Sequence, residues 1–244
     1  MHLRGKVALV TGGARRLGRA FVLALADAGM DVAVHYGHAA AAADETVAQA
    51  RRRGVRAMSF QADLQDAEAA RQLVHAVAEN LGLPQVLVNS AAIFEPGTLR
   101  DTSLENWSRH FRINLRAPFL LMQEFAHLLG DRPGKVVNIS DWRAVYPGQR
   151  YLAYTLSKAA LLTLTQMAAR ELAPHVQVNA LALGAVLPPP GEDETYLERL
   201  VRRMPARRPA RVDEVTDALL FLLHNDYITG EILFVDGGAH LVHG

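Results

Sequence analysis

The sequence predicts an α/β fold, in which a doubly wound parallel sheet of about seven strands carries helices on both faces. Three observations support this prediction: short apolar runs alternate with helix-like segments, a glycine-rich turn follows the first run, and polar residues recur where the runs end. A chain of 244 residues can bury one sizeable core. Because no linker or repeat divides it, we expect residues 1–244 to form a single domain.

The expected elements alternate along the chain. The first helix is amphipathic and closed by Gly29, the second is rich in alanine and followed by Gly54, and later helices repeat the apolar spacing of a helix face. The expected strands are residues 6–11, 31–35, 55–61, 86–90, 135–140, 176–182 and 232–235. The expected helices are residues 17–29, 39–53, 66–81, 104–129, 151–172, 195–203 and 212–224.

One late segment breaks this alternation. Residues 188–194 read Pro-Pro-Pro-Gly-Glu-Asp-Glu, and consecutive prolines followed by glycine exclude regular structure. An irregular insert after a late strand is where such folds place a substrate lid, so residues 187–210 are a candidate lid. A surface loop between two helices is an equally good interpretation.

Composition excludes several classes of function. The net charge of +1 gives no general attraction to nucleic acid or to a membrane surface. The absence of cysteine excludes disulfides and thiolate chemistry, and the ten histidines are scattered without metal-ligand spacing, so we expect no metal. We find neither a signal peptide nor an apolar run of membrane-spanning length, so we expect a cytoplasmic protein.

The turn after the first strand is a candidate dinucleotide site. It reads Thr11-Gly12-Gly13-Ala14-Arg15-Arg16-Leu17-Gly18 and opens a helix. Glycines let the backbone approach a pyrophosphate, and free N–H groups at the helix N-terminus can bind it, as in a Rossmann-type fold. Arg16 stands where a third glycine is expected. An ordinary strand–helix turn is the alternative, although the position near the N-terminus favours a cofactor loop.

The region after the second strand indicates which dinucleotide is bound. It reads His35-Tyr36-Gly37-His38 and offers no acid to bind a ribose 2′-hydroxyl, while Arg15 and Arg16 add positive charge nearby. Both features favour the 2′-phosphate of NADP(H). Solvated arginines are the alternative, but a helix N-terminus is a poor place for cations without an anion. Asp63 and Leu64, after the third strand, could contact adenine, or Asp63 could be an ordinary N-terminal acid.

A third group of residues predicts proton delivery. Tyr154 and Lys158 are four residues apart, which places both side chains on one face of a helix. A lysine beside a tyrosine favours the phenolate, so we expect a lowered tyrosine pKa. Asp141 lies thirteen residues before Tyr154, at the end of an apolar run. These three side chains would converge at the end of a strand.

Together with Asn89-Ser90-Ala91-Ala92, Asn114 and Asp236-Gly237-Gly238, these motifs resemble the short-chain dehydrogenase/reductase superfamily over nearly the whole chain. In that superfamily the position of Asp141 is usually serine. Asp141, the loop Arg15-Arg16-Leu17-Gly18 and His35-Tyr36 are similar to the pteridine reductase and dihydromonapterin/dihydrofolate reductase branch. The resemblance further implies that Phe94 stacks on a pterin.

The resemblance implies roles for individual residues. Lys158 would hold the nicotinamide ribose, Asn114 would anchor a water linking Lys158 to solvent, and Asp141, Tyr154, Phe94 and Arg16 would contact the substrate. It also implies a homotetramer formed through the long fourth and fifth helices. The residues expected to contact NADPH are Gly12, Arg15, Arg16, Leu17, His35, Tyr36, His38, Asp63, Leu64, Asn89, Ser90, Ala91, Tyr154, Lys158, Gly184 and Val186.

Asp141 carries the substrate prediction. A pterin C=N bond needs a proton on nitrogen, and a carboxyl group beside an apolar ring can have a raised pKa and act as an acid. The alternative role of Asp141 is an N-cap or a partner of Arg143. Departures from the pattern at Ser90, Ala92 and Leu183 leave the exact substrate open. A carbonyl reductase of 3-oxoacyl, sugar or quinone substrates, and a non-catalytic dinucleotide-binding protein, are the alternatives.

Overall fold

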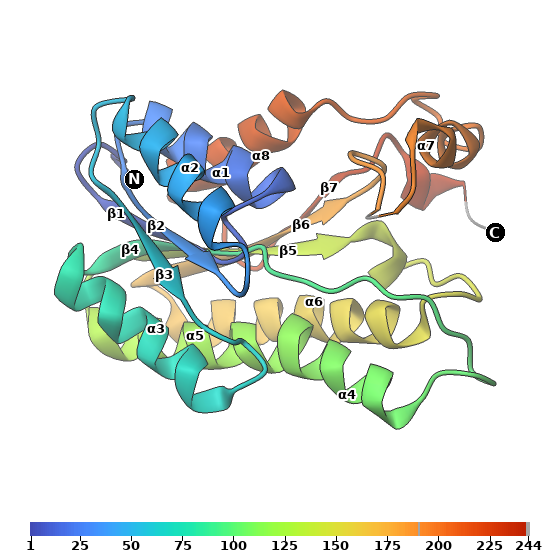
Figure 1. Cartoon of the computed structure of the whole chain (residues 1–244), viewed down its shortest axis with the longest axis horizontal. Coiled ribbons are helices and arrows are strands. Elements are labelled where there is room, and N and C mark those ends of the chain that lie inside the picture. The colour runs from blue at the N-terminus through green and yellow to red at the C-terminus, as the bar shows by residue number, and fades with distance from the viewer. Residues whose placement is uncertain (190, 243–244) are drawn as a thin grey trace.

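Seven parallel strands form one sheet in the order β3-β2-β1-β4-β5-β6-β7 (Figure 1). The computed structural model describes residues 1–189 and 191–242. The strand order reverses between β1 and β4, which creates the switch point where doubly wound folds bind ligands. This confirms the predicted fold class. The strands are β1 (Val7–Val10), β2 (Asp31–Tyr36), β3 (Ala57–Gln61), β4 (Pro84–Asn89), β5 (Gly134–Asp141), β6 (Val176–Leu183) and β7 (Ile232–Val235).

Helices cover both faces of the sheet. In Figure 1, α1, α2 and α8 lie above the sheet and α3 to α6 lie below it, while α7 stands beyond the carboxyl ends of β6 and β7. The helices are α1 (Arg16–Asp27), α2 (Ala40–Arg51), α3 (Ala67–Asn80), α4 (Leu104–Phe111), α5 (Ala117–Leu129), α6 (Leu152–Leu172), α7 (Glu194–Val201) and α8 (Val212–His224).

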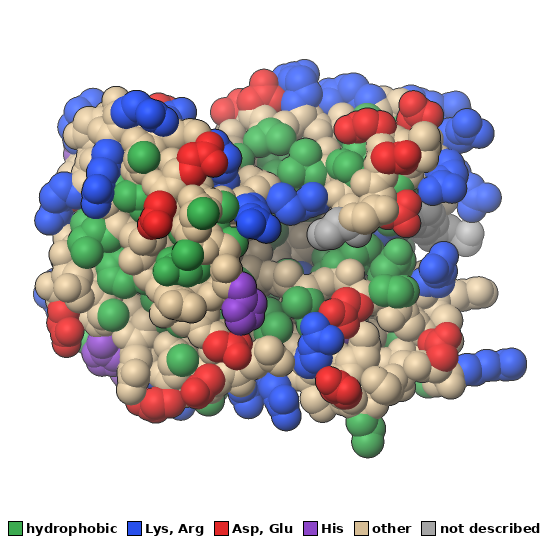
Figure 2. All heavy atoms as spheres, in the orientation of Figure 1, with side chains coloured by type: hydrophobic (Ala, Val, Ile, Leu, Met, Phe, Trp, Pro, Cys, Tyr) green, Lys and Arg blue, Asp and Glu red, His purple; other side chains and the backbone are tan. Residues whose placement is uncertain are grey.

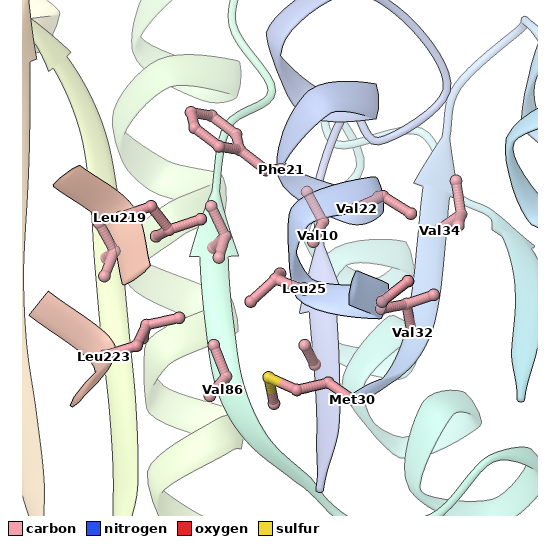
Figure 3. Close-up of a cluster of buried hydrophobic side chains, with 14 of the residues drawn as sticks. Val10, Phe21, Val22, Leu25, Met30, Val32, Val34, Val86, Leu219 and Leu223 are labelled. Atoms are coloured by element: carbon pink, nitrogen blue, oxygen red, sulfur yellow. The ribbon is translucent and has the colours of Figure 1, made fainter. Parts of the chain in front are cut away.

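The core is split between the two faces of the sheet because strand side chains alternate. In β1, Ala8 and Val10 belong to the cluster under α1 and α8, whereas Val7 and Leu9 belong to the cluster on the opposite face. Figure 3 shows the first cluster, in which Phe21 and Leu25 of α1 lie over the central strands. Burial on both faces fixes the sheet firmly, so the polar ends of its strands are held in place.

The expected continuous helix over residues 104–129 is wrong in its middle. A π-helical turn, Arg112–Arg116, separates α4 from α5. Pro118 follows the start of α5 and lacks the N–H that would pair with the Asn114 carbonyl in an α-helix. Single π-helical turns recur at functional sites, and this one contains Asn114.

The segment after β6 is the candidate lid. Its described part includes α7, and residue 190 of the Pro-Pro-Pro-Gly stretch lies outside the described residues. The guanidinium of Arg16, in the glycine-rich turn, donates to the carbonyl of Pro188 at 2.6 Å. The segment therefore contacts the turn after β1 across the strand ends. Within residues 1–189 and 191–242, no helix has the length and apolar character needed to cross a membrane.

Candidate active site

The glycine-rich turn after β1 is shaped for close backbone approach. A Cβ on Gly18 would lie 2.1 Å from the Gly12 carbonyl oxygen, so only glycine fits there. Arg16 has a φ of 54°, the left-handed backbone expected of the missing glycine. Non-glycine residues in this conformation are strained and cluster at functional sites. The turn keeps the shape of a three-glycine loop and gains an exposed guanidinium at that position.

His35 lies beneath this turn rather than on an open surface. The Gly12 N–H donates to its Nδ1 at 3.1 Å, and its Nε2 pairs with the Ala62 carbonyl at 3.1 Å. Burial lowers the pKa of His35 to about 4, so the ring is neutral at physiological pH. The structure thus gives His35 a role in holding the turn, whereas Tyr36 is half-buried and His38 is exposed at the end of β2.

The other predicted cofactor residues surround the same strand ends. Thr11 Oγ1 accepts from the backbone N–H groups of Ser90 and Ala91 at 3.0 and 3.1 Å, which joins the end of β4 to the turn. Asn89 donates to Asn138 of β5 at 2.8 Å. Arg15 and Asp63 are exposed beyond β1 and β3, and Leu17 and Leu64 are half-buried and buried, respectively.

The loop after β6 also requires a glycine. A Cβ on Gly184 would lie 2.6 Å from the Asp236 Cα, and its N–H donates to the Val235 carbonyl at 3.0 Å. The Asp236 carboxylate accepts from the Gly238 N–H, which fixes the turn after β7. Val186 is buried two residues beyond Gly184. The Asp-Gly-Gly motif therefore shapes this end of the sheet through backbone packing.

The structure brings Asp141, Tyr154 and Lys158 together as predicted. The Tyr154 hydroxyl donates to Asp141 Oδ2 at 3.1 Å. Lys158 Nζ lies 5.9 Å from the centre of the Tyr154 ring and donates to the Ile139 carbonyl at 2.7 Å. All three side chains are buried, Asp141 at the end of β5 and the others on α6.

The expected lowering of the tyrosine pKa is wrong for this geometry. Burial and the negative charge of Asp141 raise the pKa of Tyr154 well above 10, and the positive charge of Arg143 does not outweigh them. Burial lowers the pKa of Lys158 to about 8, so part of its population is neutral in mildly alkaline solution. Tyr154 is therefore held as a proton donor, and its proton faces a carboxylate.

The sequence offered two alternatives for Asp141, a place beside Tyr154 or a cap and partner of Arg143, and the structure shows both sets of contacts. It caps the short 3₁₀ turn Trp142–Ala144 by accepting the Arg143 N–H at 2.8 Å. It also pairs with the Arg143 guanidinium, whose Nη1 lies 3.3 Å from Oδ2. These contacts coexist with the hydrogen bond from Tyr154, so the cap orients the carboxylate towards the hydroxyl.

Phe94 forms an aromatic wall beside Tyr154. Its ring stacks on Tyr151 with centroids 4.1 Å apart and meets the Tyr154 ring edge-on at 4.6 Å. Tyr151 caps α6 with a left-handed φ of 64°, a second strained residue next to the site. The wall thus depends on the backbone geometry at the start of α6.

Contacts on both sides of Phe94 hold its loop. Asn114 accepts from the Ile93 N–H at 3.0 Å and donates to the Ile93 carbonyl at 3.1 Å. On the other side, the Glu95 N–H donates to the buried ring of His110 at 3.3 Å, and Arg109 pairs with the Glu95 carboxylate at 2.7 Å. Sequence reasoning missed His110 and Arg109, because only tertiary packing brings α4 against this loop.

The Asn114 side chain also contacts α6. Besides both Ile93 contacts, its amide donates to Ser157 Oγ at 3.1 Å, and Ser157 donates to the Tyr154 carbonyl. The side chain therefore connects the Phe94 loop to α6, and the structure does not test its predicted role in anchoring a water.

These strand ends fit a dinucleotide. Gly12 and Gly18 leave a backbone cradle that a Cβ would fill, the N-terminus of α1 opens beside it, and Arg15 and Arg16 are exposed there. Figure 2 shows a hollow in the face viewed, with Lys or Arg side chains along its edge. In the described residues no three His, Asp or Glu side chains are grouped to hold a metal ion.

The fold and this site together define an oxidoreductase that uses a nicotinamide dinucleotide. A family model described as Enoyl-(Acyl carrier protein) reductase matches residues 12–240. The chain belongs to the short-chain dehydrogenase/reductase superfamily.

Two relatives of this chain carry different descriptions of their activity. The 3-oxoacyl-[acyl-carrier-protein] reductase of Synechocystis sp. is 33% identical, over 97% of each chain. The crystal structure of the alternative dihydrofolate reductase FolM from Brucella canis, complexed with NADP, is 35% identical with a TM-score of 0.92, over 99% of this chain and 96% of that one. The first is described as a 3-oxoacyl-[acyl-carrier-protein] reductase and the second as a dihydrofolate reductase, at similar identity to this chain, so identity alone does not select the substrate.

Proposed function

We propose that the protein is an NADPH-dependent reductase of a pterin-type ring, a dihydropteridine or dihydrofolate. The observation that carries the proposal is a carboxylate, Asp141, hydrogen-bonded to the tyrosine acid at 3.1 Å. Beside it stands an aromatic wall, Phe94, suited to stacking a planar heterocycle. The structural similarity to a dihydrofolate reductase complexed with NADP supports the same substrate class and cofactor.

The residues present fit NADPH, which supplies a hydride to a ring carbon when it is bound. The glycine-rich turn and the N-terminus of α1 would hold its pyrophosphate, and Arg15, Arg16 and His38 would meet the 2′-phosphate. Lys158, with its pKa of about 8, would donate to the nicotinamide ribose. The buried His35 supports the turn from below.

Tyr154 supplies the proton in this proposal. The substrate C=N bond gains hydride on carbon and the Tyr154 proton on nitrogen, so the double bond becomes a single C–N bond and the dinucleotide is oxidised. The raised pKa of Tyr154 keeps that proton available across the neutral range. Asp141 accepts hydrogen bonds from Tyr154 and Arg143, so we assign it the orienting role rather than the first proton transfer.

The direct test measures NADPH oxidation with dihydrobiopterin, dihydromonapterin and dihydrofolate, beside a panel of ketones and 3-oxoacyl thioesters. We expect turnover with a pterin and a loss of at least about tenfold in Asp141→Ser, because serine cannot accept from Tyr154 as an anion. Activity on ketones alone would reject the pterin proposal. Parallel assays with NADH test the preference for NADPH.

A 3-oxoacyl reductase is the second candidate, and the 33% identical relative from Synechocystis sp. favours it. A carbonyl substrate develops negative charge on oxygen, and the neutral serine usual at this position suits that charge better than Asp141 does. In this case Asp141→Ser would retain or increase ketone reduction. The same plate of substrates therefore separates the two functions.

We further propose that a second copy of the chain covers the outer face of α4, α5 and α6. A groove of about 750 Å³ lies there, and its apolar lining includes Trp107, Phe111, Phe119 and Met167. Phe119 and Met167 are 42% and 63% exposed, which is unusual for large apolar residues outside an interface. We expect light scattering to give the mass of a tetramer, and the mass of a monomer would reject this interface.

The lid at 187–210 and the cytoplasmic location remain predictions.

A further inference from the structure

Arg143 is bound to the active-site carboxylate through both its backbone and its side chain. The backbone N–H donates to Asp141 Oδ1 at 2.8 Å, and Nη1 lies 3.4 Å from Oδ1 and 3.3 Å from Oδ2. The two side chains are only 14% and 12% exposed, so solvent screens the pair weakly. A single residue thus supplies two of the three donors around Asp141.

Aromatic rings limit where this guanidinium can go. Its Cζ lies 5.0 Å from the Trp142 ring and 5.8 Å from the Phe94 ring. Trp142 is buried in a cluster with α7, and Phe94 stacks on Tyr151. The guanidinium is therefore confined between the Phe94 ring, the Trp142 ring and the Asp141 carboxylate.

The charges around Tyr154 come from several elements. Asp141 of β5 raises the pKa of Tyr154, and Arg143 opposes that effect. Lys158 of α6 lies 5.9 Å from the ring, the His110 ring of α4 lies 6.4 Å away, and Tyr196 of α7 adds a weaker influence. Glu95 is already paired with Arg109. Arg143 is thus the cation in direct contact with the anion that Tyr154 faces.

We propose that Arg143 is a positioning residue for the reduction: it holds the Asp141 carboxylate against the Tyr154 hydroxyl and offsets the carboxylate's charge as the proton leaves the tyrosine. The inference rests on the proposed reductase function, but it applies to any substrate that takes its proton from Tyr154. Without the guanidinium, the Asp141 carboxylate would lose its side-chain donor, and its charge beside the Tyr154 hydroxyl would be uncompensated. Tyr154 would also release its proton less readily.

The first test compares the pH profile of kcat/KM for wild type, Arg143→Met and Arg143→Lys. Activity requires protonated Tyr154, and the loss of that proton sets the alkaline limb of the profile. In Arg143→Met we expect the alkaline limb to move to higher pH, because the positive charge that lowers the pKa of Tyr154 has been removed. We expect kcat to fall about tenfold or more, and Arg143→Lys to restore much of the alkaline limb. A purely structural role would lower activity without moving the limb.

The second test does not depend on turnover. Carbon-13 NMR of ring-labelled tyrosines, with Tyr154→Phe for assignment, follows the protonation of Tyr154 directly. We expect the Tyr154 titration to lie at higher pH in Arg143→Met than in wild type, and to return in Arg143→Lys. Unchanged titration, or pH profiles that coincide with wild type, would overturn the inference. If only ketones are reduced, the pterin proposal fails while the Arg143 measurements still decide its role.

Discussion

Two of the three lysines in the chain lie at opposite ends of β5, and both are buried. Lys135, at the start of the strand, lies 2.9 Å from the Asp226 carboxylate and donates to the carbonyls of Leu222 and Asn225 at the end of α8. Lys158 lies beside the end of the strand, where its ammonium donates to the Ile139 carbonyl. The charge of Asp141 raises the pKa of Lys158, but less than burial lowers it.

The difference separates a structural charge from one that lies at the proposed active site. Lys135 has a carboxylate and the carbonyls of a helix C-terminus, an arrangement that compensates a buried cation. Lys158 lacks an ion pair among the described residues, and burial lowers its pKa to about 8. Buried titratable groups with shifted pKa values mark functional sites more often than structural ones. Of these two buried lysines, the one without an ion pair among the described residues is therefore the one at the edge where a ligand can bind.

The largest effect is expected from Lys158→Met. We expect kcat to fall by about 10²–10⁴-fold, because the variant loses the cation beside the tyrosine acid. The free energy of unfolding should change by less than about 1 kcal/mol, since the lost hydrogen bond is offset by removal of a poorly compensated charge. Steady-state kinetics and urea unfolding measure both. Full activity of Lys158→Met together with a large loss of stability would show that Lys158 has a structural role instead.

An intermediate effect is expected in the pH dependence of stability. The folded pKa of Lys158 is about 8 and the unfolded value about 10.5, so between these values the unfolded chain binds the extra proton. Stability should therefore rise with pH across this window, by up to about 3 kcal/mol relative to Lys158→Met. Below pH 8 Lys158 is protonated in both the folded and the unfolded chain, so the difference in free energy of unfolding between wild type and Lys158→Met should be constant. If that difference stayed constant from pH 7 to 10.5, the lowered pKa of Lys158 would be contradicted.

The smallest effect is expected from Lys135→Met. The variant leaves two carbonyls of α8 without their donor, so we expect the free energy of unfolding to fall by about 1–2 kcal/mol. The kcat should stay within about twofold of wild type, since the site lies at the other end of β5. Asp226→Asn is the matched control: it removes the partner charge, and Asp226 is 68% exposed, so its loss should be smaller. A tenfold loss of kcat in Lys135→Met would show that the two ends are coupled.

Much of this arrangement could be predicted because it depends on local patterns. Alternating apolar runs predict the strands, and the spacing of Tyr154 and Lys158 places them on one helix face. The π-helical turn at Asn114 was not predicted, although Pro118 removes a helix donor at that position. The contacts of His110 and Arg109 with the Phe94 loop follow no spacing rule, because they join segments that meet only after folding.

The sequence by itself determined the α/β class, the glycine-rich turn and the placing of Tyr154 and Lys158 on one helix face, since each follows from side-chain type and period along the chain. Only the tertiary structure decided the electrostatics. Burial reverses the expected shift of the Tyr154 pKa, and the folding of β5 into its 3₁₀ turn places Arg143 against Asp141. Both effects depend on distance and solvent exclusion, which a linear sequence does not specify.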